Sequence, residues 1–174
     1  MSAKLRELIL LRHAKSEWKQ SELADIDRPL SDRGKKNATK MGRWLKKHTL
    51  IPDLILVSSA QRAQQTLRRI CSEFSTNVVT VDALYLADLP TLLQTLSETP
   101  PAERVMIIGH NPGLETLFNF LNHEASQNIH NTENTETVTL FPTCSLAHFI
   151  LPQTWQTLEK GDGKLLQFIR PKDL

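Results

Sequence analysis

Four short apolar runs constrain the possible folds of this chain more than any other feature. They extend from Leu8 to Leu11, from Leu54 to Val57, from Val78 to Val81 and from Val105 to Ile108. Short runs rich in Leu, Ile and Val are typical of parallel strands that are covered on both faces. We therefore expect four buried strands that belong to one sheet.

Helical patterns lie between and after these runs. Apolar residues at helical spacing predict helices from Ser31 to Lys47 and from Ala60 to Phe74, a shorter helix from Thr91 to Leu96, and another after Pro112. Ser31 suits the N-cap of the first helix, because its hydroxyl can accept from a free backbone N–H. Strands that alternate with helices over short connections indicate an α/β domain with a largely parallel sheet.

The rest of the chain is expected to complete a single domain, residues 1–174. Two further strands are predicted around Ser145 to Leu151 and Lys164 to Ile169, with a glycine-containing turn at 161–163 before the second. Residues 122–137 are polar and rich in Asn, Thr and Glu, which predicts an exposed loop with freedom to move.

The charge balance argues against two classes of partner. The formal net charge is +2 at pH 7, which is too small for nucleic acid or an anionic membrane to be the main partner. No apolar run reaches the length of a membrane span, and the N-terminal residues lead into a strand rather than a signal sequence. The two cysteines, Cys71 and Cys144, are too few for a disulfide framework. We therefore expect a cytoplasmic protein.

Basic and histidine side chains follow three of the predicted strands. Arg12 and His13 come directly after the first strand, Arg62 lies in the first turn of the helix that follows the second strand, and His110 comes after the fourth. In an open α/β sheet, ligands bind beyond the carboxyl ends of the strands. Because these ends share one edge of the sheet, we expect the four side chains to meet there.

Such a cluster is suited to a doubly charged anion. Arg62 by itself would suggest an exposed charge, and His110 by itself a capping or core residue, but their coincidence with Arg12 and His13 favours a site. A phosphoryl group fits best, because guanidinium groups match its oxygens in bidentate fashion. Two arginines would repel a metal cation, so no metal is expected. Surface or core roles are expected for the other histidines, His48, His123, His130 and His148.

Four sequence blocks resemble the histidine phosphatase superfamily, which includes the phosphoglycerate mutases. The blocks are residues 11–18, residues 28–34, Ser58 with residues 62–66, and residues 109–112, and they come in the order of the family. The small size and the Arg28-Pro29-Leu30 block are most similar to the SixA-type phosphohistidine phosphatases. The resemblance implies a phosphoglycerate mutase-like three-layer sandwich, with a mostly parallel central sheet, helices on both faces, and no metal or organic cofactor.

The resemblance makes His13 the nucleophile. Neutral imidazole is a good nucleophile at physiological pH, and the charges of Arg12 and Arg62 should keep His13 unprotonated. Attack on phosphorus would give a phosphorylated His13, from which water releases phosphate. Arg12, Arg62 and His110 would bind the equatorial oxygens of the phosphoryl group. By resemblance Ser16 would add a hydroxyl to the same pocket, although it fits a simple turn equally well.

One departure from the family pattern bears on the substrate. Relatives that act on alcohol phosphates carry a glutamate after the third strand as general acid, whereas the segment from Asp82 to Asp88 contains none. Its two aspartates fit solvated loop positions better than a catalytic role. An alkoxide leaving group needs a proton, whereas an imidazole protonated on its far nitrogen leaves as a neutral base of pKa roughly 6.5. A phosphoramidate or an activated ester is therefore favoured over a sugar phosphate.

Three functions stay open at this point. The first is a phosphatase that hydrolyses a phosphohistidine in a protein, or a phosphomonoester, through a covalent intermediate on His13. The second is a phosphatase of the same superfamily for a small phosphorylated metabolite. The third is a catalytically silent phosphate-binding module, while a mutase is disfavoured by the missing acid and the short chain. Ser58 is expected to support its neighbours rather than to attack, because no nucleophile-elbow motif surrounds it.

Overall fold

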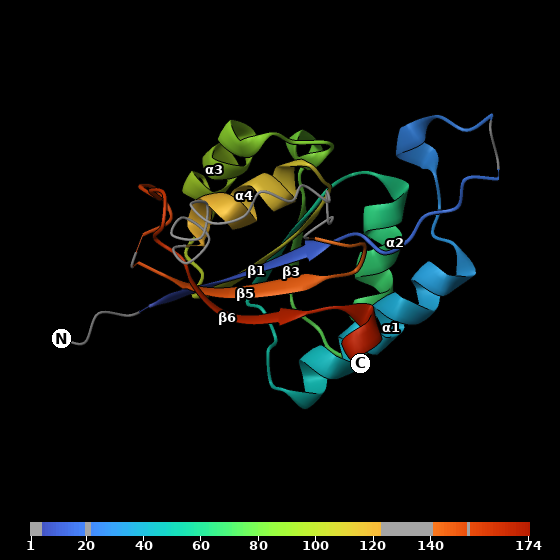
Figure 1. Cartoon of the computed structure of the whole chain (residues 1–174), viewed down its shortest axis with the longest axis horizontal. Coiled ribbons are helices and arrows are strands. Elements are labelled where there is room, and N and C mark those ends of the chain that lie inside the picture. The colour runs from blue at the N-terminus through green and yellow to red at the C-terminus, as the bar shows by residue number, and fades with distance from the viewer. Residues whose placement is uncertain (1–4, 20–21, 123–140, 153) are drawn as a thin grey trace, which may run out of the picture.

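The computed structural model describes residues 5–19, 22–122, 141–152 and 154–174. Figure 1 shows a layer of strands between two layers of helices. The elements in chain order, with η marking short 3₁₀ helices, are β1 (Arg6–Arg12), η1 (Asp25–Asp27), α1 (Asp32–Lys47), β2 (Leu54–Val57), α2 (Gln61–Ile70), β3 (Asn77–Thr80), η2 (Asp82–Leu84), α3 (Leu89–Ser97), β4 (Arg104–Gly109), α4 (Gly113–Leu121), β5 (Leu146–Leu151), β6 (Lys164–Ile169) and η5 (Pro171–Asp173).

The six strands form one sheet in the order β3-β2-β4-β1-β5-β6. The first four strands in this order pair in parallel, and β5 and β6 add an antiparallel edge. The sheet is therefore mostly parallel, as the sequence predicts. The two central strands, β1 and β4, end level with each other, because Arg12 is in register with Gly109.

Alternate residues of β1 face opposite helix layers. Leu8 and Leu10 belong to the core cluster that includes residues of α3 and α4, whereas Ile9 and Leu11 belong to the cluster that includes residues of α1 and α2. Figure 1 shows these two helix pairs on opposite faces of the sheet. All four side chains are fully buried, and burial of each contributes roughly 1.5–3 kcal/mol. A central strand with helices on both faces therefore reads as a continuous apolar run.

The start of α1 agrees with the predicted cap. The Ser31 side chain accepts from the backbone N–H of Gly34, and Asp32 lies in the first turn. A hydroxyl acceptor and a negative charge both offset the free N–H groups at a helix N-terminus. This cap fixes where α1 begins relative to the loop that follows β1.

The prediction of a fully buried strand from Val78 to Val81 is wrong in its burial. The strand β3 is present, but its residues are exposed, with 42% of Val78 and 43% of Val79 accessible to solvent. The strand lies at the end of the sheet, where it pairs with β2. An apolar run does not by itself distinguish an edge strand from a central one, because strand position depends on the order in which the whole chain assembles.

The predictions for the polar loop and for the remaining histidines have different outcomes. The polar loop 122–137 lies outside the described residues apart from Asn122, as do His123 and His130. His148 is buried, and its Nε2 lies 2.8 Å from Oε2 of Glu7, so it has a partner that the sequence did not indicate. In the described part of the chain, no helix combines the length and the apolar character needed to span a membrane.

Candidate active site

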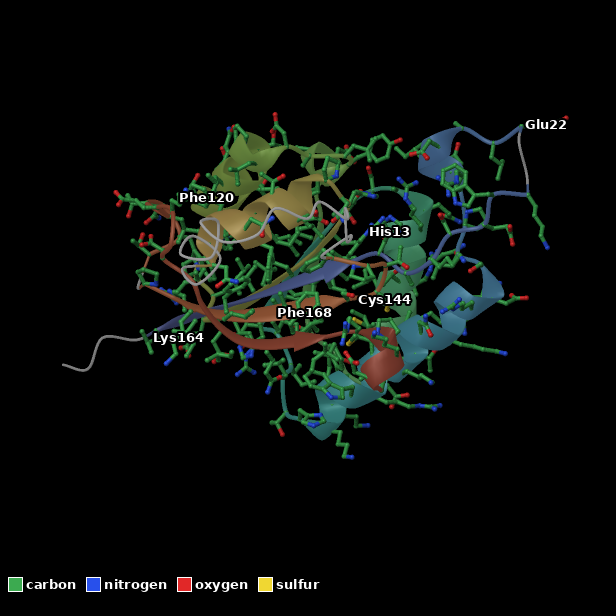
Figure 2. The ribbon with its side chains drawn as sticks, in the orientation of Figure 1. His13, Glu22, Phe120, Cys144, Lys164 and Phe168 are labelled. Carbon is green, nitrogen blue, oxygen red and sulfur yellow. The ribbon has the colours of Figure 1, made fainter. Side chains whose placement is uncertain are left out.

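The predicted side chains meet at the adjoining ends of β1 and β4. The backbone N–H of His13 donates to the carbonyl of Gly109 at 3.0 Å, and the rings of His13 and His110 lie 5.1 Å apart between centroids. Arg62, in the first turn of α2, places its Nε 3.3 Å from Nε2 of His13. Figure 2 shows His13 just beyond the tip of β1. The chain thus brings together the residues expected at the strand ends, and their catalytic roles stay predictions.

The contacts of His13 determine which ring nitrogen is free to attack. Its Nδ1 lies 2.7 Å from the carbonyl oxygen of Ala14. A carbonyl oxygen can only accept, so we assign the proton to Nδ1 and the lone pair to Nε2. The Arg62 Nε–H points its donor at this lone pair. His13 therefore presents a nucleophilic Nε2 on a side chain that is only 7% exposed.

His110 is arranged as a donor. Its Nε2 lies 2.7 Å from Oγ of Ser58, and that oxygen accepts from the backbone N–H of Ala60 at 3.2 Å. The Ser58 hydroxyl can then donate to Nε2, which leaves the His110 proton on Nδ1. That Nδ1 is buried and has no partner among the described residues. An unpaired buried donor costs roughly 1–3 kcal/mol, and a bound anion would satisfy it.

Arg62 is held in place by Asp25 of η1. One terminal nitrogen of Arg62 donates to the Asp25 carbonyl at 2.6 Å, and the other lies 3.0 Å from Oδ2 of its carboxylate. The hydroxyl of Tyr85 donates to the same Oδ2 at 2.6 Å, and Arg28 donates to Oδ1 at 2.8 Å. The hydrogen bond from Tyr85 and the two arginines hold the pKa of Asp25 well below its usual range. The group is therefore an ionised anchor for Arg62.

Burial keeps both imidazoles uncharged at neutral pH. Desolvation lowers the pKa of His13 from 6.5 to about 3, and the positive charges of Arg62 and Arg12 act in the same direction. Desolvation, followed by the charge of Arg62, lowers the pKa of His110 to about 4. A neutral His13 is the form that can attack phosphorus. A bound dianion would offset the positive field and raise both pKa values.

Arg12 contributes donors from the strand end itself. One of its terminal nitrogens donates to the carbonyl of Phe141 at 2.9 Å, which orients the guanidinium. Its Nε is buried with no hydrogen-bond partner in the described parts of the chain. Together with Nδ1 of His110, this gives the site two buried donors that an oxyanion would satisfy.

Arg28 ties the loop after β1 to η1. It donates to Oγ of Ser16 and to Asp25, and its guanidinium carbon lies 3.2 Å from the ring centroid of Trp18. Ser16 thus accepts from Arg28 and keeps its own proton free for an anion, so the predicted role for its hydroxyl stays open. Sequence reasoning placed Arg28 only in a family block, and it did not predict this bridging role.

Gly34, the last residue of the family block 28–34, lies where α1 contacts the loop that follows β1. A Cβ added to Gly34 would lie 2.1 Å from the carbonyl oxygen of Lys15. The backbone N–H of Ser31 donates to the same oxygen at 2.9 Å. The start of α1 therefore packs directly against the loop that follows His13, and only glycine fits at the contact.

A cleft of about 830 Å³ opens over the cluster. Arg12, His13, Ser16 and Arg62 belong to its wall, whereas His110 packs against the His13 ring and does not line the wall. Within the described residues, the wall contains no aspartate or glutamate. The cleft therefore offers hydrogen-bond donors and positive charge to its ligand.

Asp82 and Asp88, the two aspartates in the segment where relatives carry a general acid, do not line the cleft. Asp88 caps the N-terminus of α3, and Asp82 is an exposed residue of η2. Two other carboxylates border the site instead: Asp25 through Arg62, and Glu115, whose Oε2 accepts from the side-chain amide of Asn111 at 3.1 Å. Sequence reasoning missed both. The one signal for Asp25 was its spacing of three residues from Arg28.

Sequence comparisons point to one family. The model of the histidine phosphatase superfamily (branch 1) matches residues 8–88. An uncharacterized chloroplastic protein of Arabidopsis thaliana is 34% identical over 129 residues, which is 67% of this chain and 59% of that protein, so the match spans about three-fifths of that relative. An uncharacterized protein of Mycobacterium leprae is 29% identical over 171 residues, which cover 93% of this chain and 100% of the relative.

Solved structures agree with the sequence match. A Nakamurella multipartitia protein proposed to be the phosphohistidine phosphatase SixA superposes with a TM-score of 0.80 at 26% identity over 96% of both chains. A protein of Agrobacterium tumefaciens with the same proposed assignment has a TM-score of 0.78 at 28% identity, over 95% of this chain and 98% of that one. The protein histidine phosphatase SixA bound to tungstate, at 21% identity and a TM-score of 0.74 over 95% of this chain and 97% of that one, shares the fold.

Proposed function

We propose that this chain, which belongs to the histidine phosphatase superfamily, hydrolyses the P–N bond of a phosphorylated histidine side chain in a protein. The family match and the solved structures support a phosphatase, and the choice of substrate goes beyond them. The observation that carries this choice is the set of donors and cations around a neutral His13, in a cleft whose wall holds no acid among the described residues.

The reaction proceeds in two displacements. Nε2 of His13 attacks phosphorus, and the bond from phosphorus to the substrate imidazole breaks. The electron pair of that bond returns to the substrate nitrogen, and the imidazole, already protonated on its far nitrogen, leaves as a neutral base. Water then attacks the phosphorus of phosphorylated His13, the bond from Nε2 to phosphorus breaks with its electron pair returning to Nε2, and phosphate leaves with the oxygen and both protons of that water.

The surrounding groups stabilise the charge that spreads over the phosphoryl oxygens. Arg62 and Arg12 supply guanidinium donors, and Nδ1 of His110 supplies a third donor that is otherwise unpaired. Groups positioned before the reaction act most strongly in a buried site, where water does not screen them. The proton on Nδ1 of His13, held by the Ala14 carbonyl, directs Nε2 toward the phosphorus.

The state of Asp25 supports a substrate that brings its own proton. Tyr85, Arg28 and Arg62 hold its pKa well below the usual range, so the carboxylate carries no proton to give at neutral pH. An alkoxide would leave this site without help from Asp25, whereas an imidazole needs none.

A small phosphomonoester is the second candidate substrate, and Glu115 is the observation in its favour. Its carboxylate borders the cleft through the side chain of Asn111. If it served as general acid, the substitution Glu115→Gln would slow hydrolysis of a sugar phosphate far more than hydrolysis of an activated ester.

The decisive comparison is kcat/KM on a phosphohistidine peptide against kcat/KM on a sugar phosphate. We expect the peptide to be preferred by at least about 100-fold, because its leaving group needs no acid. A preference for the sugar phosphate would overturn the proposed substrate while leaving the phosphatase assignment intact.

Rapid-quench labelling tests the covalent step. A ³²P-labelled substrate should leave acid-labile label on the wild-type chain within a turnover. The variant His13→Ala should carry no label and lose on the order of 10³-fold or more in kcat. The matched control is His48→Ala, which removes an exposed histidine that packs on Trp44 and should label normally. Label that persists on His13→Ala would refute the nucleophile.

A further inference from the structure

The cleft carries more positive charge than one phosphoryl group requires. Arg12, Arg28 and Arg62 lie around the histidines, and four further cations line the outer part of the same cleft. We call these four the outer wall: Lys15, Arg33, Arg170 and Lys172. The inner cations and the outer wall line the same cleft, and none of the described residues that line it is an aspartate or a glutamate.

Three separate segments build the outer wall. Lys15 lies in the loop after β1, Arg33 in the first turn of α1, and Arg170 and Lys172 at the C-terminal 3₁₀ helix η5. In Figure 1 η5 lies beside α1, far along the chain from β1. The fold therefore gathers these charges at one place although they are distant in the sequence.

The charges of the outer wall are poorly compensated. Lys15 and Arg33 make no ion pair with any described residue, and Arg33 lies at the positive end of a helix, where a cation is unfavourable. Arg170 and Lys172 share one carboxylate, Asp173, whose Oδ2 lies 3.0 Å from Nε of Arg170 and whose pKa is lowered by Arg170 and, to a smaller degree, by Lys172. Like charges gathered without partners repel one another, and a bound polyanion would remove that cost.

The shape of the cleft favours an extended ligand. At about 830 Å³ it approaches the upper end of the range of small-molecule pockets, and a phosphoryl group fills only the part next to His13. Trp18 belongs to the wall, is 72% exposed, and stacks on the guanidinium of Arg28. Exposed Trp beside Arg is the composition that anchors protein partners.

We propose that the outer wall binds an acidic segment of the protein that carries the phosphorylated histidine, with aspartate or glutamate side chains near that histidine. This inference rests on the proposed function and deepens it by naming the chemistry of the partner surface. Charges spread over three segments match several carboxylates along a chain better than one compact second phosphate. The outer wall would then select among phosphorylated proteins, while the inner cations hold the reacting group.

The test measures binding separately from turnover. Two fluorescein-labelled peptides of equal length carry a non-hydrolysable phosphonate analogue of phosphohistidine, one with Asp and Glu flanks and one with Ser and Asn flanks. Fluorescence anisotropy gives Kd for the wild-type chain and for the double variant Arg33→Gln/Lys172→Gln. The matched control is Lys46→Gln/Lys47→Gln, which removes the same charge from the last turn of α1, roughly 20 Å along the helix.

We expect the acidic peptide to bind the wild-type chain at least about tenfold more tightly than the neutral one, and 0.5 M salt to erase the difference. The double variant Arg33→Gln/Lys172→Gln should lose the preference, because it raises Kd for the acidic peptide far more than Kd for the neutral peptide. Equal Kd values for the two peptides on the wild-type chain would overturn the inference. So would an equal loss in the Lys46→Gln/Lys47→Gln control, which would mean a general effect of net charge.

Two parallel measurements separate this inference from the proposed function. If inorganic tripolyphosphate binds tightly through Arg33 and Lys172 while the peptides bind equally, the wall serves a small polyanion and the inference is wrong. Hydrolysis of true phosphohistidine peptides is followed with the same proteins. An acidic preference in binding without hydrolysis supports the outer wall and refutes the proposed function, whereas hydrolysis with equal kcat/KM for both flanks refutes the outer wall alone.

Discussion

The substitution Asp25→Asn tests whether a single carboxylate holds Arg62 in place beside His13. Asn keeps the size of the side chain, and the backbone carbonyl of residue 25 still accepts from Arg62. The change removes the negative charge that faces Arg62 at 3.0 Å and Arg28 at 2.8 Å, and it weakens the acceptor for Tyr85. Arg62 is then held less firmly in the orientation that directs its Nε at Nε2 of His13.

The magnitude follows from the burial of the pair. A hydrogen bond to a charged group contributes about 1.5–3 kcal/mol when it is desolvated. The Arg62 side chain is 4% exposed but that of Asp25 is 44% exposed, so water replaces part of the lost interaction and we take about 1 kcal/mol for its effect on Arg62. That corresponds to a loss of about fivefold in kcat/KM.

The assay compares kcat/KM of Asp25→Asn with that of Asp27→Asn, a control that removes an exposed aspartate from the same η1 helix. We expect the fivefold loss to be equal for a sugar phosphate and for p-nitrophenyl phosphate, because an anchor of Arg62 acts on the phosphoryl group and not on the leaving group. A loss confined to the sugar phosphate would show that Asp25 is a general acid, and full activity would show that Arg62 is held without it.

Four further outcomes are expected. Because the folded pKa of His13 is about 3 and that of His110 about 4, kcat/KM on p-nitrophenyl phosphate, which has no imidazole of its own to titrate, should show no step near pH 6.5, and such a step would refute the assigned neutral nucleophile. The free energy of unfolding, measured in urea, should fall as pH drops from 6.5 toward 4, by at most about 1.4 kcal/mol per pH unit for each of these histidines. The reason is that the histidines of the unfolded chain bind protons in this range, whereas the buried imidazoles of the folded chain do not. Ser58→Ala should lower kcat/KM about tenfold, since it removes the hydroxyl that sets the tautomer of His110, and should lower the free energy of unfolding by about 1–3 kcal/mol, because the buried N–H of Ala60 loses its acceptor; an unchanged kcat/KM would contradict the role in setting the tautomer. Gly34→Ala should lower stability by about 1–3 kcal/mol, measured as urea midpoint, because its Cβ meets the Lys15 carbonyl; an unchanged midpoint would mean that this loop yields freely.

Local patterns determined the elements of the fold and the candidate residues of the site. The runs at 8–11, 54–57 and 105–108 are central strands as expected, and Ser31 caps α1. Strand periodicity and capping depend on neighbours in the sequence, so they can be read without coordinates. The convergence of His13, Arg62 and His110 was also foreseeable, because parallel strands end at the same edge of a sheet.

Only the tertiary structure decided which groups surround these residues and in what state. The burial that lowers the pKa of His13, the Ser58 hydroxyl behind His110 and the Asp25 carboxylate on Arg62 come from segments far apart in the chain. The exposure of β3 and the gathering of the outer wall from three segments have the same origin. Electrostatic and packing energies depend on distance in space, and sequence spacing does not report that distance once the chain has folded back on itself.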